Sequence, residues 1–128
     1  MAAAKRERPE RDPAPLHHML DLARAAVSYT TGRSLDEVSS NWIHWQGLSH
    51  SLTLIGRNAG RVSSQGRAAL PEVDWTGLIE TGELLITEYN EPHEQLVWRT
   101  INEDLPPLIV ALERILAEPP PDSEMTHP

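Results

Sequence analysis

The chain has 128 residues, a formal net charge of −8 and no cysteine. This length suits a single domain, and the lack of cysteine excludes disulfides and thiolate metal sites and fits a cytoplasmic protein. We expect neither a membrane span nor a secretion signal, because no apolar run is long enough to cross a bilayer and the charged segment MAAAKRERPERDPAP is not followed by an apolar core.

Both ends of the sequence are predicted to be disordered tails. Residues 1–14 are charged and contain proline, and residues 117–128 are polar and rich in proline. Neither segment can bury enough apolar surface to offset the entropy of ordering it. We therefore expect one folded domain over residues 15–116.

The first predicted helix starts at Pro15 or Leu16, because proline is favoured at the first helical position. Apolar side chains then recur with a helical period as far as Thr30. Gly32 follows, and we expect it to end the helix as a left-handed C-cap.

A second, long helix is predicted to begin after Ser34. Ser34 and Glu37 form the Ser-x-x-Glu pattern of a capping box, and apolar residues then recur every three or four positions over residues 38–62. We expect a break near residues 39–41. Gly56 and Gly60 share a face of this helix, which should allow another backbone to approach it closely.

The third helix is predicted to cover the segment WTGLIETGELLITEY. Asp74 precedes this segment and is a good N-cap, and the stretch SSQGRAALPEVD before it is expected to be a connection. The helix should end before Pro92, because a proline disfavours helical geometry at the residue that precedes it.

The last helix is expected from His93 to Leu116. Pro106 and Pro107 lie inside its apolar stripe, and the period continues across them. They should therefore kink this helix rather than end it.

No segment shows the alternation of a β-strand, so the sequence predicts an all-α protein, an antiparallel bundle of four or five helices. Its tryptophans are expected in the core rather than on a base-stacking surface, since large aromatic residues at helical spacing are normally buried; they are Trp42, Trp45, Trp75 and Trp98. None of the six histidines has the spacing of a metal site, so we expect no metal and no cofactor.

The acidic residues are concentrated in one region. Residues 72–104 contain nine Asp and Glu residues against one basic residue, Arg99. A surface built from this region repels phosphate, because Lys and Arg contacts supply most of the non-specific affinity of proteins for nucleic acids. We therefore expect weak RNA binding or none.

Several segments together resemble the HepT-like proteins of the HEPN superfamily. They are HMLDLARAAVSYTTGRS, LTLIGRNAGRVS, LPEVDW, LLITEY and LVWRTINEDLPPLIVALERIL. The most specific run starts at Trp98 and reads Trp-x-Thr-Ile-x-x-Asp-Leu-Pro. The resemblance covers residues 16–116 without an obvious gap.

The resemblance implies a helical bundle that pairs into a homodimer. It also implies a metal-independent ribonuclease toxin beside a minimal nucleotidyltransferase antitoxin, which silences the toxin by nucleotidylating a tyrosine. The active motif of the family is an Arg, usually an Asn, three more residues, a His, one residue and that Tyr. The Arg stabilises phosphate charge and the His moves the proton of the ribose 2′-hydroxyl, in a cleft that both protomers form.

This chain departs from the motif of the family it resembles. Counting from Trp75 through LLI places Gly82 at the Arg position, Glu83 at the Asn position and Thr87 at the His position, and only Tyr89 is kept. Gly82 offers no side chain to a phosphate, and Thr87 cannot take up a proton near neutral pH. Glu83 is negative where a phosphodiester would bind. We therefore predict a degenerate catalytic site.

Three functions stay open on the sequence alone. The first is an inactive family member that dimerises and binds a partner, either a nucleotidyltransferase-type protein or an active relative. The second is an active ribonuclease whose site has moved to other residues, for which Arg57, Arg61, His50 and His93 are the candidates. The third is a structural helical subunit of a larger assembly.

Tyr89 is the candidate for nucleotidylation if the relationship with a transferase persists. Ile79 and Ile86 are spaced for the same side of its helix. This spacing favours the alternative that Tyr89 is packed at the end of an apolar face.

Overall fold

The computed structural model describes residues 13–117, and all regular secondary structure in this range is helical. The predicted tails, residues 1–14 and 117–128, lie almost entirely outside the described residues. The elements are α2 (Ala14–Thr30), α3 (Leu35–Ser39), α4 (Trp42–Gly60), α5 (Ser64–Ala68), α6 (Trp75–Thr87), α7 (Glu94–Arg99), the π-helical segment η2 (Thr100–Asp104) and α8 (Leu105–Ala117). This confirms the predicted all-α class.

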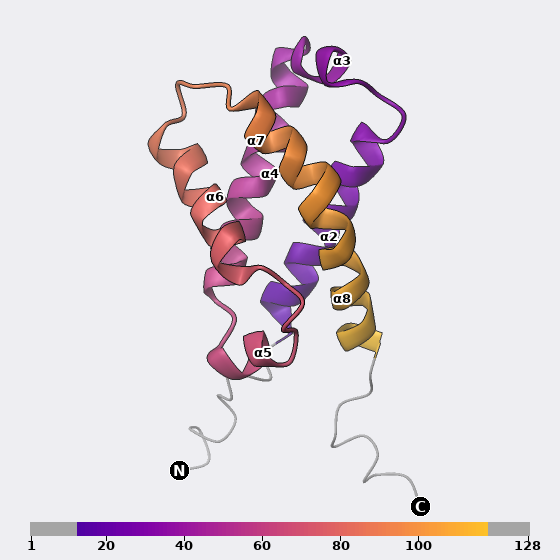
Figure 1. Ribbon diagram of the computed structural model, residues 1–128, viewed down its shortest axis with the longest axis vertical. Helices are drawn as coiled ribbons and strands as arrows, with labels where there is room; N and C mark the ends of the chain where they lie inside the picture. Colours follow the sequence, from indigo (N-terminus) through magenta and orange to yellow (C-terminus); the bar gives the residue numbers. More distant parts are fainter. Residues whose placement is uncertain (1–12, 118–128) are drawn as a thin grey trace, which may run out of the picture.

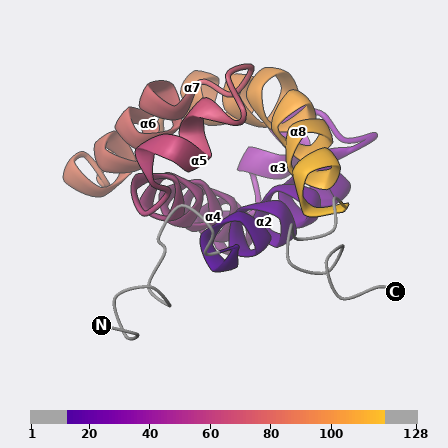
Figure 2. The same ribbon diagram turned by 90° about the horizontal axis from the view of Figure 1, so that it is seen from below.

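The four long helical runs form an antiparallel bundle (Figure 1). The chain ascends in α2, descends in α4, ascends in α6 and descends through α7, η2 and α8. α4 packs most extensively on α6 and α2, and α2 also packs on α8. Seen from below, these helices surround a common interior (Figure 2). α3 closes the upper end, where α4 begins and α6 ends, and α5 lies at the opposite end.

Three predicted signals at helix ends are confirmed, whereas α6 ends at Thr87, two residues before the predicted end at Tyr89. Gly32 has a φ of 80°, the left-handed conformation expected just after α2. Ser34 and Glu37 form the reciprocal capping box at the start of α3. The predicted break falls between α3 and α4, where the Asn41 side chain accepts a hydrogen bond from the backbone N–H of His44 at 3.0 Å and caps α4.

α4 and α6 approach each other at two glycines. A Cβ atom on Gly56 would lie 2.6 Å from the Leu78 carbonyl oxygen, and one on Gly82 would lie 3.2 Å from the Gly56 Cα. The prediction of a close backbone approach is therefore confirmed at Gly56 and wrong at Gly60, where a Cβ would meet nothing within 4 Å. Because α6 of the same chain covers Gly56, this glycine offers no argument for a second protomer.

The connection before α6 contains a helix that the sequence analysis missed. Ser63 caps the short helix α5 by accepting a hydrogen bond from the Gly66 N–H. Asp74 caps α6, as predicted, through the Gly77 N–H. The Trp75 indole then donates to the Leu70 carbonyl oxygen at 3.2 Å, which ties this connection to the core.

The last helix runs from residue 94 to residue 117 and changes type in the middle. We predicted a kink at Pro106 and Pro107, and the irregularity is a turn of π-helix directly before them, in which the Leu105 N–H donates to the Thr100 carbonyl oxygen. A proline lacks the N–H that an α-helix needs, and its ring clashes with the carbonyl four residues earlier. The wider turn accommodates both defects without ending the helix.

The core contains aliphatic residues from every long helix together with two of the four tryptophans, Trp45 and Trp75. Trp98 is partly buried against this core. The prediction for Trp42 is wrong, because its side chain is 68% exposed. Within the described range, no helix is long and apolar enough to cross a membrane.

Candidate functional site

The segment that corresponds to the family motif lies on α6 and the turn that follows it. Its residues point in different directions: Gly82 is buried, whereas Glu83, Thr87 and Tyr89 are exposed. The Thr87 hydroxyl donates to the Leu84 carbonyl oxygen of its own helix at 3.4 Å. The structure therefore places three side chains on the surface and the fourth position inside a helix–helix contact.

Gly82 is held in this contact by two backbone segments of α4. A Cβ atom at residue 82 would lie 3.2 Å from both the Gly56 Cα and the Thr53 carbonyl oxygen. Backbone atoms cannot give way as the end of a flexible side chain can, so a larger residue at this position has to push α4 and α6 apart. Gly82 therefore has a packing role in this fold.

An open groove of about 420 Å³ runs along α4 and α6 beside this contact. Gly56, Gly60 and Gly82 lie among the residues that line it. α4 contributes Arg57 and Arg61, one helical turn apart, and α6 contributes Glu83. We call this cavity the motif groove, because it contains the first two motif positions.

The motif groove has a cationic side and an acidic side. Within residues 13–117, neither Arg57 nor Arg61 forms an ion pair or a side-chain hydrogen bond, and Glu83 forms none either. Ile79 and Ile86 extend the α6 side, and Ile86 is about half exposed. Charges and apolar groups in the groove are thus available to a second molecule.

The candidate histidines do not join the arginines in the motif groove. His50 is exposed on α4 and is not among the residues that line it. His93 lies beyond the end of α6, where its Nε2 atom is 3.0 Å from the Glu88 carbonyl oxygen. Among the described residues, no group of three or more His, Asp or Glu side chains could hold a metal ion.

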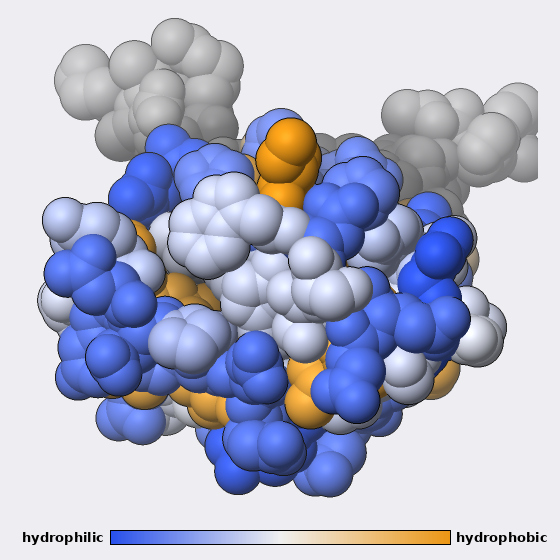
Figure 3. Space-filling model, turned by 90° about the horizontal axis from the view of Figure 1, so that it is seen from above, coloured by the Kyte–Doolittle hydropathy of each residue, from blue (hydrophilic) through white to orange (hydrophobic). Residues whose placement is uncertain are grey.

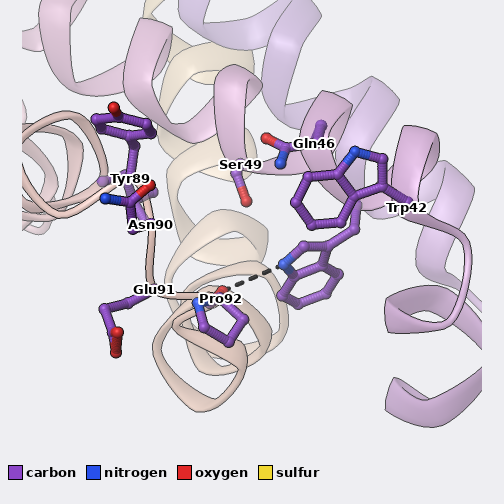
Figure 4. A pocket seen from close by; sticks show the side chains of 9 residues that line it. Trp42, Gln46, Ser49, Tyr89, Asn90, Glu91 and Pro92 are labelled. Carbon is purple, nitrogen blue, oxygen red and sulfur yellow. Dashed lines mark hydrogen bonds between the residues drawn. The ribbon is translucent and has the colours of Figure 1, made fainter.

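A second cavity, of about 190 Å³, opens at the upper end of the bundle next to Tyr89. Figure 3 looks onto this end of the molecule, where pale and orange side chains of low polarity occupy the middle of a hydrophilic surface. The walls come from the start of α4, which contributes Trp42, Trp45, Gln46 and Ser49, and from the α6–α7 turn, which contributes Tyr89, Asn90, Glu91 and Pro92 (Figure 4). We call this cavity the Tyr89 pocket.

Two contacts hold the α6–α7 turn that forms one wall of the Tyr89 pocket. The Trp45 indole donates to the Pro92 carbonyl oxygen at 3.2 Å (Figure 4), and His93 contacts the Glu88 carbonyl oxygen. His93 also has a positive φ of 50°, which is uncommon outside glycine. The sequence analysis missed this pocket because the contact joins residues 47 positions apart, and no local pattern encodes such a pairing.

Tyr89 is 74% exposed, so the prediction that it packs at the end of an apolar face is wrong. Figure 4 shows its hydroxyl pointing away from Trp42. The other tyrosine of the chain, Tyr29, is partly buried and hydrogen-bonds to His44. The two tyrosines therefore differ, because the Tyr29 hydroxyl is engaged in a hydrogen bond whereas that of Tyr89 forms none among the described residues.

Three carboxyl groups have shifted pKa values, and none of them lies in the motif groove or the Tyr89 pocket. Burial raises the pKa of Asp104, and Arg99 nearby opposes this effect. The pKa of Glu37 is lowered by hydrogen bonds from the Ser34 backbone and hydroxyl. The pKa of Glu72 is lowered by its own backbone N–H and by Arg114.

Comparison with known proteins agrees with the resemblance noted in the sequence. Residues 19–115 match the family model described as "Ribonuclease HepT-like". The chain is also 23% identical over 91 residues to "Putative RNase MJ1380" of Methanocaldococcus jannaschii, an alignment that covers 71% of this chain and 84% of that protein. No solved structure matches. Since the family match covers most of the bundle, the chain belongs to the HepT-like ribonuclease family.

Proposed function

We propose that this chain is a catalytically inactive member of the HepT-like family that acts by self-association and by binding a partner protein. The observation that carries the proposal is the position of Gly82. The residue that corresponds to the motif Arg is packed against Gly56 and Thr53 of α4. It has no side chain, and the fold leaves no room for a long one in its present packing.

The remaining motif positions support the loss of chemistry. Abstraction of a ribose 2′-hydroxyl proton needs a group that takes up protons near neutral pH, which a threonine hydroxyl at residue 87 does not. Stabilising the developing phosphate charge needs a cation, and Glu83 places an anion beside Gly82. Among the described residues, no histidine lines the motif groove to replace the missing proton acceptor.

The test is an RNA cleavage assay with purified protein. We expect no cleavage, and weak RNA binding at physiological salt, because residues 72–104 offer one arginine against nine acids. An active family member assayed under the same conditions is the positive control. Dose-dependent cleavage that co-purifies with the protein through successive columns would contradict the proposal.

The catalytic motif can be restored as a complementary test. Glu83→Asn and Thr87→His change exposed residues and should be tolerated, whereas adding Gly82→Arg should lower the melting temperature because of the contact with α4. We expect the triple variant to gain RNA cleavage only if α4 and α6 can separate. Its melting temperature, measured alongside activity, distinguishes a misfolded variant from a folded but inactive one.

A second candidate function is an active ribonuclease with a displaced site, and one observation favours it. Arg57 and Arg61 line the same groove as Gly82 and have no acidic partner within the described residues. Two cations one turn apart could hold a phosphodiester there. If cleavage is detected, Arg57→Gln and Arg61→Gln should each abolish it. No described histidine lines the groove, so His50→Gln and His93→Gln then test whether either histidine carries the proton.

The proposal includes nucleotidylation of Tyr89 by a transferase-type partner. The exposed hydroxyl supports it, because a transferase can reach this tyrosine without unfolding the chain. The protein should be incubated with a nucleotidyltransferase-type partner and ATP, and the adduct located by mass spectrometry. We expect the mass shift to disappear in Tyr89→Phe and to persist in the matched variant Tyr29→Phe. A shift retained in Tyr89→Phe would refute the assignment.

A further inference from the structure

We propose that the Tyr89 pocket is a docking site for an arginine side chain presented by a basic segment of a partner protein. This inference deepens the proposed partner-binding role and rests on it. It is carried by the shape of the pocket, by its aromatic walls and by the charges around its mouth.

The walls offer flat aromatic faces to a small group. Trp42 stands on the α4 side and Tyr89 on the side of the α6–α7 turn, with Pro92 below (Figure 4), and the buried Trp45 also lines the pocket. The indole N–H of Trp42 has no hydrogen-bond partner among the described residues, in contrast to the indole of Trp45. A guanidinium group stacks on such faces and is attracted by their π electrons.

The polar groups in the pocket accept hydrogen bonds. Gln46 and Ser49 line the α4 side, Asn90 and Glu91 line the turn, and each carries a side-chain oxygen (Figure 4). A guanidinium has five N–H donors and no acceptor, so these oxygens match its needs. A volume of about 190 Å³ accommodates this group and the end of its aliphatic stem.

The upper end of the bundle is acidic. Exposed carboxylates lie on α3, directly after α6 and at the start of α7, namely those of Asp36, Glu37, Glu88, Glu91 and Glu94, and Glu91 is among the residues that line the pocket. The cation in the α2–α3 connection, Arg33, is already engaged, because its guanidinium lies 4.7 Å from the centre of the Tyr29 ring and donates to the Tyr29 carbonyl oxygen. These charges attract a basic segment and repel nucleic acid.

Exposed apolar side chains continue beyond the pocket. Ile43, next to Trp42, is 77% exposed, and Ile86 lies one turn before Tyr89 and is about half exposed. Ile86 also lines the motif groove, so Ile43 is the one that adds exposed apolar area directly beside Trp42, and contiguous area of this kind favours an interaction surface. The partner segment should therefore carry apolar residues beside its arginine, and an aromatic–arginine contact of this kind is typical of the residues that dominate binding energy at interfaces.

The site can be tested without knowing the partner. N-acetyl-arginine amide is titrated into the ¹⁵N-labelled protein, and the four tryptophan indole N–H signals and the backbone N–H signals are followed by NMR. N-acetyl-citrulline amide, a neutral molecule of nearly the same shape, is the matched ligand control. We expect saturable shifts at Trp42, Tyr89 and Asn90 in the millimolar range, with binding of the citrulline compound weaker by roughly three- to tenfold.

Two protein variants sharpen the test. Trp42→Ala removes an exposed side chain and should weaken arginine binding by roughly two- to fivefold without changing the melting temperature. Val110→Ala, which removes an equally exposed side chain on α8 outside the pocket, should leave binding unchanged. Higher salt should weaken binding of the arginine compound more than that of the citrulline compound.

Several outcomes would overturn the inference. They are equal binding of the two ligands, unchanged binding in Trp42→Ala, shifts confined to acidic residues elsewhere on α6, or no saturation in the millimolar range. Tighter binding of adenosine than of the arginine compound would assign the pocket to a nucleobase instead. None of these results bears on whether the protein cleaves RNA, so failure of the docking site and failure of the proposed inactivity are distinguished.

Discussion

Asp104 shows how a single side chain can cost stability for no gain in packing. It lies in the π-helical segment beside a small cavity lined by Glu72 and Asp74, so a charge there meets like charges and partial burial. Burial raises its pKa. A carboxyl group whose pKa is higher in the folded than in the unfolded state opposes folding once it is ionised.

We therefore expect Asp104→Asn to raise the free energy of unfolding at neutral pH. The gain should be at most about 0.5 kcal/mol, because most of the group is exposed and water screens it. This gain should vanish as the pH falls below the ordinary pKa of an aspartate, because Asp104 is then protonated in both the folded and the unfolded chain. Thermal melts between pH 3 and pH 8 measure the effect. Glu80→Gln, which removes the same charge at an exposed site on α6, is the control, and an equal gain in that variant would assign the effect to net charge.

At the scale of helices, two glycines of α4 should respond to alanine in opposite directions. A Cβ on Gly56 would lie 2.6 Å from the Leu78 carbonyl oxygen, whereas one on Gly47 would meet nothing within 4 Å. We expect Gly56→Ala to destabilise the fold by about 1–3 kcal/mol through overpacking. Gly47→Ala should stabilise it by about 0.5–1 kcal/mol, because alanine restricts the unfolded chain. Chemical denaturation of both variants measures the difference, and a Gly56→Ala variant as stable as the original would show that α4 and α6 do not approach so closely.

Local helix signals could be read from the sequence because each one is complete within a few residues. Ser34 caps through Glu37 and Asp74 caps through Gly77, so both partners of each hydrogen bond lie in one short stretch. Trp42 shows where this reasoning fails. A helical period assigns a residue to a face but does not say how far along that face the neighbouring helices extend. Trp42 opens α4 at the end of the bundle and is left exposed.

The residue types of the candidate site can be read from the sequence, but their arrangement in space cannot. Comparing the chain with the motif letter by letter predicts that Gly82 and Thr87 are losses. It cannot show that Gly82 is buried against Gly56 or that Arg57 reaches the same groove, because those contacts join α4 to α6 across a connection that the sequence leaves undefined. The Tyr89 pocket depends in the same way on a turn that folds back onto α4.

At the scale of the whole molecule, the motif groove suggests how two copies would meet. Its cationic side consists of Arg57 on α4 and Arg61 directly after α4, and its acidic side is Glu83 on α6. These side chains form no ion pair within the described residues. A two-fold axis would bring the α4 side of one copy against the α6 side of the other, so the pairing of arginine with glutamate would occur twice in the dimer. Ile86 adds exposed apolar area to the same face.

This arrangement makes a prediction that mixing can test. Light scattering should give twice the 14.3 kDa of one chain. Arg57→Glu and Glu83→Arg should each weaken the dimer, because each homodimer then has like charges facing one another at two places. An equimolar mixture of the two variants should dimerise again, since every Glu at residue 57 can face an Arg at residue 83 and every original Arg57 can face an original Glu83.

Val110→Glu, a charge introduced on α8 away from the groove, controls for a general effect of charge. If the original protein is a monomer at tens of micromolar, or if mixing the two variants restores nothing, the two copies do not meet through the motif groove, and its unpaired charges must serve a different partner.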